Sequence, residues 1–302
     1  MGTRLARWSG GLALHLDHDW YDLAALTSGD EEFGAAWWAA ATASSEPVYR
    51  DLARLLDRVG SRPRPEPLDA AAVEAGLRTP VWGSGMIYCA ALNYHSHVAE
   101  SGGTAPDQPL FFLKPFRCLV DPGDGAALPR SSAQVDYEIE LAVVIGRRGK
   151  AIAAADAYDH IAGYTVINDL SYRDLQIRQT ATARTVDWVQ GKALDSAAPI
   201  GPWVVPSGEL ADPGALDLTL TVNGEARQTI NSSDMIFDIP TLIERLSADI
   251  TLYPGDVIAT GTGAGVGKYR RPGGEWLSAG DKLELTIAGI GTLSHGMTGG
   301  DR

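Results

Sequence analysis

Cysteine is scarce in this chain of 302 residues, which contains only Cys89 and Cys118. Two cysteines over this length do not form a disulfide framework, so the small secreted domains that depend on one are excluded. Both lie in apolar or mixed segments, which favours free thiols in a reducing cytoplasm. A single disulfide between them is the alternative that the sequence leaves open.

Long hydrophobic runs and excess positive charge are also missing. No apolar stretch nears membrane-spanning length, and the first residues lead into no apolar signal segment, so we expect a cytoplasmic protein. Lys and Arg number 25 against 38 Asp and Glu, which gives a net charge of −13. Such a field repels nucleic acid and anionic membranes, and the expected partner is a small molecule. An acidic protein can still hold a local cationic site, for example through a bound divalent metal.

The N-terminal quarter contains mixed secondary-structure signals. Residues 4–26 read as short strands and turns, and helices are expected over 35–41 and 48–59. The second helix opens after Pro47 and carries leucines and a valine at helical spacing. Residues 61–67 then contain three prolines in five positions, which forbids a helix and suits a linker. We therefore predict a small N-terminal β-rich domain with its linker over 1–67 and a main domain over 68–302.

The main domain is predicted to be mainly β, in an α+β arrangement. Asn223-Gly224 between two β runs predicts a two-residue hairpin, and helices are expected only over 156–161 and 239–248. The pattern is not an alternating array of strands and helices. Buried strands are expected at 86–92, 138–145, 164–170, 203–206, 216–222, 256–260 and 282–287.

Two carboxylates stand out at the start of one strand. On a β-strand residues i and i+2 point to the same face, so Glu138 and Glu140 project together. Adjacent carboxylates at the edge of a core repel one another, so either one keeps its proton or a cation lies between them. An exposed edge strand with two solvated glutamates is the equally weighted alternative.

Asp169 favours the cation hypothesis, because it follows another apolar strand at 166–168. An isolated aspartate there is more often a turn former, but two glutamates and one aspartate make an oxygen-only site. Such a site prefers Mg²⁺ or Mn²⁺ over Zn²⁺. No His/Cys cluster occurs at ligand spacing, which argues against zinc.

His97 and Glu100 follow the first buried strand of the main domain and stand three residues apart. On a helical turn this spacing lets the carboxylate hold the imidazole, which could then take a proton from water. A surface His/Glu pair is the alternative, and for a single pair it is the commoner case. The glycine-rich residues 261–267 do not fit a dinucleotide site, because Val266 stands where the third glycine belongs.

Taken together and in order, these motifs resemble the fumarylacetoacetate hydrolase family from about Gly85 to Met297. Each motif alone is weak, whereas the ordered set is specific. The resemblance rests on Asn93-Tyr94, His97, Glu100, Phe112-Leu113-Lys114-Pro115, Asp136-Tyr137-Glu138, Glu140, Asn168-Asp169, Gly191-Lys192, Asp234-Met235-Ile236-Phe237, Pro254-Gly255-Asp256 and Thr260-Gly261-Thr262.

The resemblance implies a mixed β-sandwich roll, usually a homodimer, with one Mg²⁺ or Mn²⁺ near its mouth. It implies Glu138, Glu140 and Asp169 as metal ligands, and His97 with Glu100 as a water-activating dyad on a lid. The remaining implied site residues are Lys192 for developing negative charge, Gln176 and Thr262 as substrate contacts, and Lys114 close by. Arg173 is expected to join the two lysines in a positive patch that selects a small chelating anion.

Departures from the family pattern include Ile139 between the two glutamates, Gly263 after Thr262, and Ala91 before Leu92. They alter loops around the pocket and remove no implied ligand. The hypothesis is hydrolysis of a carbon–carbon bond in a 1,3-dicarbonyl acid such as an acylpyruvate. Decarboxylation of an oxo-acid or enol/keto isomerisation on the same metal site is the alternative. A non-enzymatic homologue that binds a small molecule is a further one.

Overall fold

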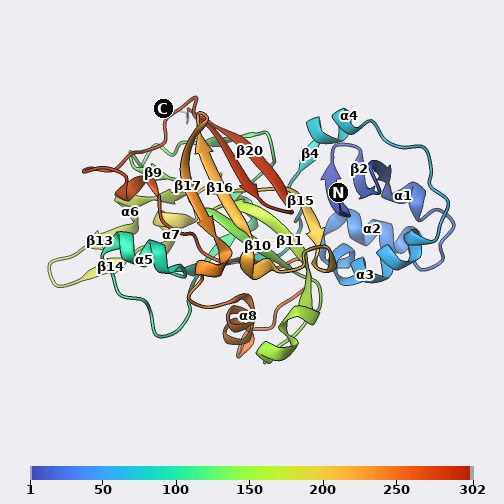
Figure 1. Cartoon of the computed structure of the whole chain (residues 1–302), viewed down its shortest axis with the longest axis horizontal. Coiled ribbons are helices and arrows are strands. Elements are labelled where there is room, and N and C mark those ends of the chain that lie inside the picture. The colour runs from blue at the N-terminus through green and yellow to red at the C-terminus, as the bar shows by residue number, and fades with distance from the viewer. Residues whose placement is uncertain (1, 300–302) are drawn as a thin grey trace.

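The computed structural model describes residues 2–299 and consists mainly of β-strands with short helices at their ends, as predicted (Figure 1). A large sheet runs in the order β3-β2-β1-β15-β11-β10-β18-β5-β6, and β4 and β7 pair with β1 and β15. Its main-domain strands are β5 (Met86–Ala91), β6 (Leu110–Pro115), β7 (Leu119–Val120), β10 (Ile139–Ile145), β11 (Ile161–Asn168), β15 (Ala198–Pro206) and β18 (Val257–Ala259).

The middle of this sheet is buried along its whole length. Every residue of β10, β11 and β15 is buried, in keeping with their nearly continuous apolar sequences. Elements on both sides therefore cover these strands. β10 lies between β11 and β18, so it is a central strand and the exposed-edge alternative for Glu138 and Glu140 is wrong.

A second, five-stranded sheet packs against β10, β11 and β15 and completes a sandwich. In β19 the buried residues alternate with exposed ones, as expected for a sheet with one face in the core. The predicted hairpin is present, with φ of 53° at Asn223 and 79° at Gly224. The strands are β17 (Glu225–Asn231), β16 (Asp217–Val222), β19 (Lys282–Ile287), β20 (Gly291–Thr298) and β8 (Gly125–Ala127).

The N-terminal region extends the large sheet. β1 pairs antiparallel with β15, where Leu5 lies opposite Val204, so the sheet continues from one region into the other. The proposed division at residue 67 stays a prediction. This region, blue at the right of Figure 1, contains β1 (Arg4–Trp8), β2 (Gly11–Leu16), β3 (Asp19–Asp22), β4 (Leu77–Arg78), α1 (Leu23–Leu26), α2 (Ala35–Ala43), α3 (Glu46–Gly60) and α4 (Ala70–Ala75).

Short elements gather at the other end of the molecule, at the left of Figure 1. They are α5 (His95–Ser101), α6 (Arg173–Gln176), α7 (Trp188–Lys192), β9 (Val135–Asp136), β12 (Ser171–Tyr172), and the hairpin β13 (Ile177–Gln179) and β14 (Arg184–Val186). The helix predicted over 239–248 is present as α8 (Ile239–Ser247), which lies below the sheets in Figure 1. The helix expected over 156–161 is instead a 3₁₀ segment, Ala154–His160, packed against α8.

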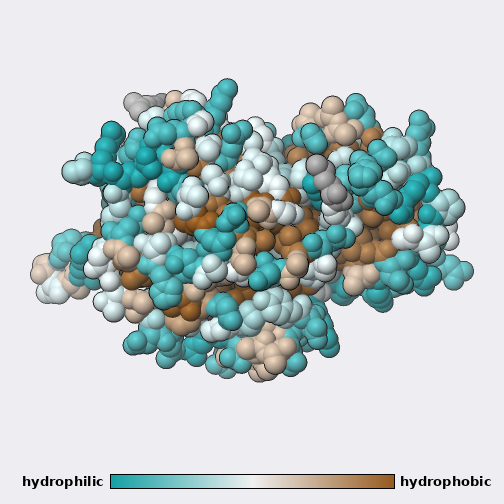
Figure 2. Space-filling model, in the orientation of Figure 1, coloured by the Kyte–Doolittle hydropathy of each residue, from teal (hydrophilic) through white to brown (hydrophobic). Residues whose placement is uncertain are grey.

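The surface is hydrophilic around the rim of the view in Figure 2, with hydrophobic residues showing between the polar ones across its middle. Within residues 2–299, no helix combines the length and apolar character needed to cross a bilayer. Cys89 and Cys118 are both free and buried, so the disulfide alternative is wrong. The homodimer and the cytoplasmic location stay predictions.

Candidate active site

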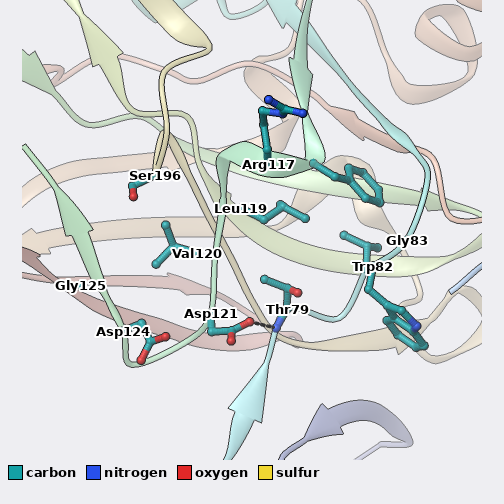
Figure 3. Close-up of a pocket in the computed structure, with 12 residues that line it drawn as sticks. Thr79, Trp82, Gly83, Arg117, Leu119, Val120, Asp121, Asp124, Gly125 and Ser196 are labelled. Atoms are coloured by element: carbon teal, nitrogen blue, oxygen red, sulfur yellow. Dashed lines mark hydrogen bonds between the residues drawn. The ribbon is translucent and has the colours of Figure 1, made fainter. Parts of the chain in front are cut away.

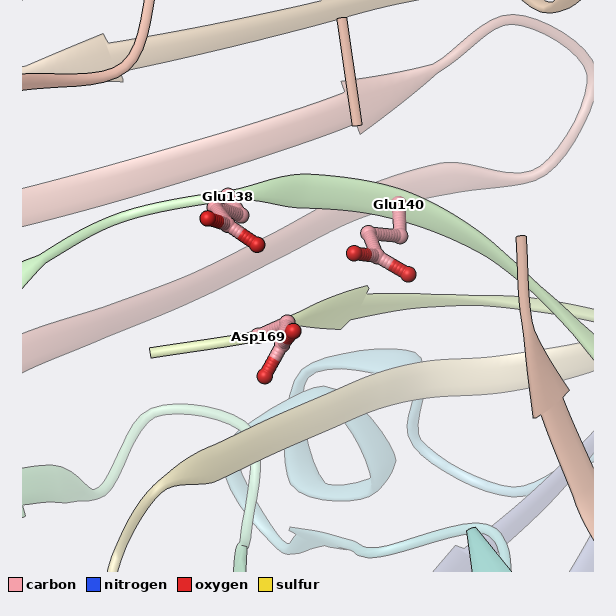
Figure 4. A group of neighbouring side chains, drawn as sticks. All are labelled: Glu138, Glu140 and Asp169. Atoms are coloured by element: carbon pink, nitrogen blue, oxygen red, sulfur yellow. The ribbon is translucent and has the colours of Figure 1, made fainter. Parts of the chain in front are cut away.

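The three predicted ligand carboxylates meet at one point (Figure 4). Glu138 precedes β10, Glu140 lies in it, and Asp169 follows the neighbouring strand β11. The antiparallel register pairs Ile139 with Asn168, which brings the two strand ends together. Carboxylate oxygens of the three residues lie within 4.8 Å of one another, and all three residues are buried. Local alternation and sheet register thus suffice to build this cluster.

Two basic side chains neutralise part of the cluster. Lys192 Nζ lies 2.7 Å from Glu138 Oε2 and 2.6 Å from Asp169 Oδ2. Arg173 Nη2 lies 2.5 Å from Glu138 Oε1. Burial alone would raise the pKa of Glu138, but Lys192 and Arg173 outweigh it and hold that pKa well below its usual range. Glu138 is therefore ionised at neutral pH.

Lys114 lies beneath the cluster and is fully buried, rather than at the surface of a cavity. Its Nζ donates to the carbonyl oxygens of Leu170 at 3.0 Å and Ala197 at 2.7 Å. It also lies 2.7 Å from Asp169 Oδ1. Lys114 thus contacts Asp169 and the surrounding backbone.

The donor set fits a hard divalent cation. Asp169 Oδ1 is buried and lies 2.7 Å from Lys114 Nζ, but a carboxylate oxygen has two lone pairs, so one remains for a metal. Burial, followed by the charges of Asp169 and Glu138, raises the pKa of Glu140 well above its usual range. A cation among the three carboxylates would remove this repulsion and keep Glu140 ionised. All the atoms offered are oxygens, as Mg²⁺ and Mn²⁺ prefer.

Backbone N–H groups of the glycine-rich loop, residues 261–267, bind two carboxylates of the site. The N–H of Gly261 donates to Glu140 Oε2 at 2.8 Å, and the N–H of Gly265 donates to Glu100 Oε2 at 2.9 Å. Both glycines have positive φ, 90° and 102°, which a side chain would strain. The same loop therefore positions both the predicted metal ligand Glu140 and the dyad residue Glu100. The sequence argued against a dinucleotide site at these glycines but did not indicate this role.

The predicted dyad is formed on α5. His97 Nδ1 lies 2.8 Å from Glu100 Oε1, and His97 is buried, so the surface-pair alternative is wrong. The helix is anchored at two further points: Ser96 N–H donates to Asp234 Oδ2 at 2.9 Å, and Ser96 Oγ accepts from Ala264 N–H at 3.1 Å. The predicted lid helix is thus packed in place, with the imidazole already oriented.

A cavity of about 250 Å³ joins His97 to Glu138 and Glu140, whereas Glu100 and Asp169 lie behind its lining. The predicted residues that line it are His97, Glu138, Glu140, Arg173, Gln176, Lys192 and Thr262. Gln176 Oε1 accepts from Arg173 at 3.4 Å, which leaves its amide N–H groups for a ligand. Thr262 Oγ1 donates its only proton to Ile139 O at 2.7 Å, so its hydroxyl can offer a substrate only an acceptor.

Several supporting residues were not predicted from the sequence. Gln228 accepts from Ile139 N–H at 3.0 Å and donates to Thr262 Oγ1 at 2.9 Å, so it fixes the backbone between the two glutamates. Asn168 Oδ1 accepts from Glu138 N–H at 3.0 Å, and its amide lies 2.9 Å from His295 Nε2. No local pattern marks Gln228 or His295, because both reach the site from the second sheet.

Asp136 could have been recognised, since it stands two residues before Glu138 in the same motif. Its Oδ1 accepts from Gly267 N–H at 2.7 Å, and its Oδ2 accepts from Arg173 Nε at 2.8 Å. Tyr137 N–H and Lys268 N–H add two more donors. A carboxylate with four donors has no capacity left for a metal, so Asp136 acts by holding Arg173 and the glycine-rich loop.

A larger cavity of about 540 Å³ lies elsewhere, between β4 and the β7–β8 region (Figure 3). Of its two carboxylates, Asp121 and Asp124, the first is occupied by Thr79 N–H at 2.6 Å and by Arg78 at 3.0 Å. None of the predicted site residues lines it. The chemistry-bearing groups therefore favour the smaller cavity as the active site.

Comparison with known proteins agrees with this fold and site. The family model of the fumarylacetoacetate hydrolase C-terminal domain matches residues 86–298. That match covers most of the chain, and the chain therefore belongs to the fumarylacetoacetate hydrolase family. Proteins similar to it include hydrolases, isomerases and tautomerases.

Two relatives and one solved structure illustrate this range. A 2,4-didehydro-3-deoxy-L-rhamnonate hydrolase from Sphingomonas sp. is 42% identical over 213 residues, covering 70% of this chain and 73% of the relative. An oxaloacetate tautomerase from Bacillus subtilis is 45% identical over 212 residues, covering 69% and 68%. The structure of maleylpyruvate hydrolase from Sphingobium sp. with manganese(II) and pyruvate has a TM-score of 0.78 and 32% identity, covering 99% and 100%.

Proposed function

We propose that this protein is a Mg²⁺- or Mn²⁺-dependent hydrolase that cleaves a carbon–carbon bond in an acylpyruvate or a related 1,3-dicarbonyl acid. The observation that carries the proposal is the meeting of dyad and carboxylates: His97, Glu138 and Glu140 line one cavity. A similar structure is a maleylpyruvate hydrolase that holds manganese(II) and pyruvate. A base beside a carboxylate cluster that can hold a cation is an arrangement that can activate water for hydrolysis.

Glu138, Glu140 and Asp169 would hold the cation, which when bound supplies a Lewis acid for the α-oxo-carboxylate of the substrate. His97, oriented through Nδ1 by Glu100, takes a proton from water as the water attacks the distal acyl carbonyl carbon. The bond from that carbon to the methylene breaks, and its electron pair leaves with the pyruvate enolate. The enolate carbon then takes up a proton, so the products are a carboxylate and pyruvate.

Lys192 is suited to the enolate charge. Two of its three N–H donors face Glu138 and Asp169, and the side chain lines the cavity. The remaining donor is available to the substrate oxygen that becomes negative. Gln176 offers its amide to the substrate carboxylate. These residues act where charge develops, which lowers the barrier of the chemical step rather than only tightening ground-state binding.

Tautomerisation of oxaloacetate is the second candidate, because a relative 45% identical over 212 residues is an oxaloacetate tautomerase. This reaction needs proton transfer at carbon but no attack by water. The two candidates share the carboxylates and Lys192, and they differ in what His97 activates. Decarboxylation of an oxo-acid stays a third possibility on the same site.

One panel of substrates separates these reactions. The purified protein, loaded with Mg²⁺ or Mn²⁺, is given acetylpyruvate, its methyl ester, and oxaloacetate in its keto and enol forms. Release of pyruvate and acetate from acetylpyruvate, with slow turnover of the ester, supports the proposal. If the oxaloacetate tautomers interconvert and acetylpyruvate stays intact, the protein is a tautomerase and the proposed hydrolysis is wrong. If oxaloacetate releases CO₂ instead, the protein is a decarboxylase.

A further inference from the structure

Part of the cavity wall is apolar, although it adjoins the charged site. It is formed by four separate segments: the residue after β5, strand β6, the β13–β14 hairpin with the start of α7, and the 3₁₀ segment at 267–269. Ordinary folding does not require apolar side chains from four segments to surround an open cavity. The residues of this apolar wall are Leu92, Phe112, Ile177, Val186, Trp188 and Tyr269.

Three of these side chains are unusually exposed for their type. Leu92, Val186 and Tyr269 have exposed fractions of 38%, 39% and 36%. Leu92 also has a φ of 53°, a conformation that glycine or asparagine adopts far more readily. Residues held in such conformations cluster at active sites and ligand-binding sites, and Leu92 alone of the five described positive-φ non-glycine residues lines this cavity. The site therefore keeps exposed apolar surface that a bound apolar group would cover.

The apolar wall adjoins both ends of the proposed chemistry. Phe112 and Trp188 stack with ring centroids 4.8 Å apart, and Lys192 Nζ lies 5.1 Å from the Phe112 ring. On the other side, the ring of Tyr269 lies 6.1 Å from that of His97. A substrate whose α-oxo-carboxylate occupies the charged end can therefore place its acyl group against these rings.

The cations around the cavity offer little to a second carboxylate. Lys192 and Arg173 are already paired with carboxylates. Among the cations that line the cavity in the described residues, Lys268 alone is in no ion pair, and it is exposed. Its Nζ lies 5.0 Å from the ring of Tyr269. An anionic acyl end would thus lose its hydration where it packs against the apolar wall. Only the solvated Lys268 could compensate for that loss of hydration free energy.

We infer that the acyl end of the substrate is uncharged and apolar, an aliphatic or aromatic group that packs against Leu92, Val186 and Trp188. This inference rests on the proposed function, since it names the substrate class of that same site. A dicarboxylic substrate anchored by Lys268 is the outcome that would replace it.

A pair of 2-oxo acids tests the inference without turnover. 4-Methyl-2-oxopentanoate and 2-oxoglutarate share the α-oxo-carboxylate head and chain length, but one ends in an isopropyl group and the other in a carboxylate. Their dissociation constants are measured by calorimetry on the metal-loaded protein. We expect the isopropyl acid to bind at least about tenfold more tightly, since each buried CH₂ gains roughly fourfold and an unpaired carboxylate loses affinity. Equal binding or a preference for 2-oxoglutarate overturns the inference.

Matched variants locate the effect. Val186→Lys places a cation on the apolar wall and should shift the ratio of the two dissociation constants at least about tenfold toward 2-oxoglutarate. Val189→Lys, three residues along and 64% exposed outside the cavity lining, should leave the ratio unchanged. Lys268→Met should also leave it unchanged. A selective loss of 2-oxoglutarate binding in Lys268→Met would place a carboxylate at Lys268 and overturn the inference.

Failure of the inference is distinguishable from failure of the proposed function. Acetylpyruvate has almost no acyl tail, so its cleavage depends on the charged end of the site alone. If acetylpyruvate is cleaved but the isopropyl acid has no advantage, the hydrolase proposal holds and the apolar acyl group is wrong. If the isopropyl acid is favoured but no acylpyruvate is cleaved, the ligand class holds and the proposed hydrolysis is wrong.

Discussion

Lys114 Nζ and Asp169 Oδ1 lie 2.7 Å apart, and neither side chain is appreciably exposed. The pair joins β6 to the loop after β11, directly below the carboxylate cluster. A buried charge is costly unless an opposite charge and hydrogen bonds accompany it. Lys114 meets this requirement through Asp169 and two backbone carbonyls. It therefore fixes Asp169 in place and does not line the cavity.

Replacing Lys114 with Met should lower the free energy of unfolding of the metal-free protein by about 3–5 kcal/mol, because it leaves a buried carboxylate short of its partner. Urea unfolding measures the change. Lys150→Met, at an exposed position, is the control and should stay within about 0.5 kcal/mol of the parent protein. A Lys114→Met protein as stable as the parent would mean that Lys192 alone neutralises Asp169.

Replacing Glu140 with Gln should have opposite effects on the metal-free and metal-loaded proteins. Without metal, the substitution removes a carboxyl group whose ionisation is opposed by burial, Asp169 and Glu138, so the melting temperature should rise by a few degrees. With Mg²⁺ or Mn²⁺ present, the parent protein should gain thermal stability because the cation binds only the folded state, and the variant should gain much less. Thermal unfolding with and without chelator measures both effects.

Two controls accompany that experiment. Glu66→Gln, at an exposed position, should leave both melting temperatures unchanged. Chelation should also abolish activity of the parent protein, and Mg²⁺ or Mn²⁺ should restore it. Full activity in the chelated protein would contradict the metal assignment.

The dyad can be tested with His97→Ala and Glu100→Gln. Each should lower kcat by about 10²–10⁴-fold, the usual contribution of a general base and its orienting group. Metal affinity should change little, because neither residue belongs to the carboxylate cluster. Single-turnover rates and metal titrations give the two quantities. His18→Ala, in an exposed turn, is the control, and near-parental kcat in His97→Ala would place the base elsewhere.

His295 should make the stability of the protein depend on pH. Burial lowers the pKa of His295 from its usual 6.5 to about 4. Between these values the unfolded chain binds a proton that the folded protein does not, so stability falls as the pH falls. From pH 7.5 to 5 this group alone should cost about 2 kcal/mol, calculated from that shift.

The contribution of His295 is isolated by comparison with His295→Gln, which keeps an acceptor for Asn168 but does not titrate in this range. Urea unfolding at the two pH values gives the difference between the two proteins. The parent protein should lose about 2 kcal/mol more than the variant over this interval. Parallel losses in both proteins would mean that His295 is protonated in the folded state.

Much of the fold was predictable because its signals are local. Continuous apolar runs indicated β10, β11 and β18, and Asn223-Gly224 indicated the hairpin between β16 and β17. Residues 156–161 predict an α-helix, whereas the structure has a 3₁₀ segment at Ala154–His160. In so short a stretch the residue types do not distinguish the hydrogen-bond spacing of an α-helix from that of a 3₁₀ helix. The pairing of β1 with β15 had no local signal at all.

The sequence by itself determined which side chains point to the same face of a strand and which are one helical turn apart. The two-residue period of a strand placed Glu138 beside Glu140, and the three-residue step on a helix placed Glu100 beside His97. Only the tertiary structure decided what surrounds them. Lys114, Gly265 and His295 reach the site from separate elements, and contacts between distant segments depend on the register and packing of the two sheets, which no local period encodes.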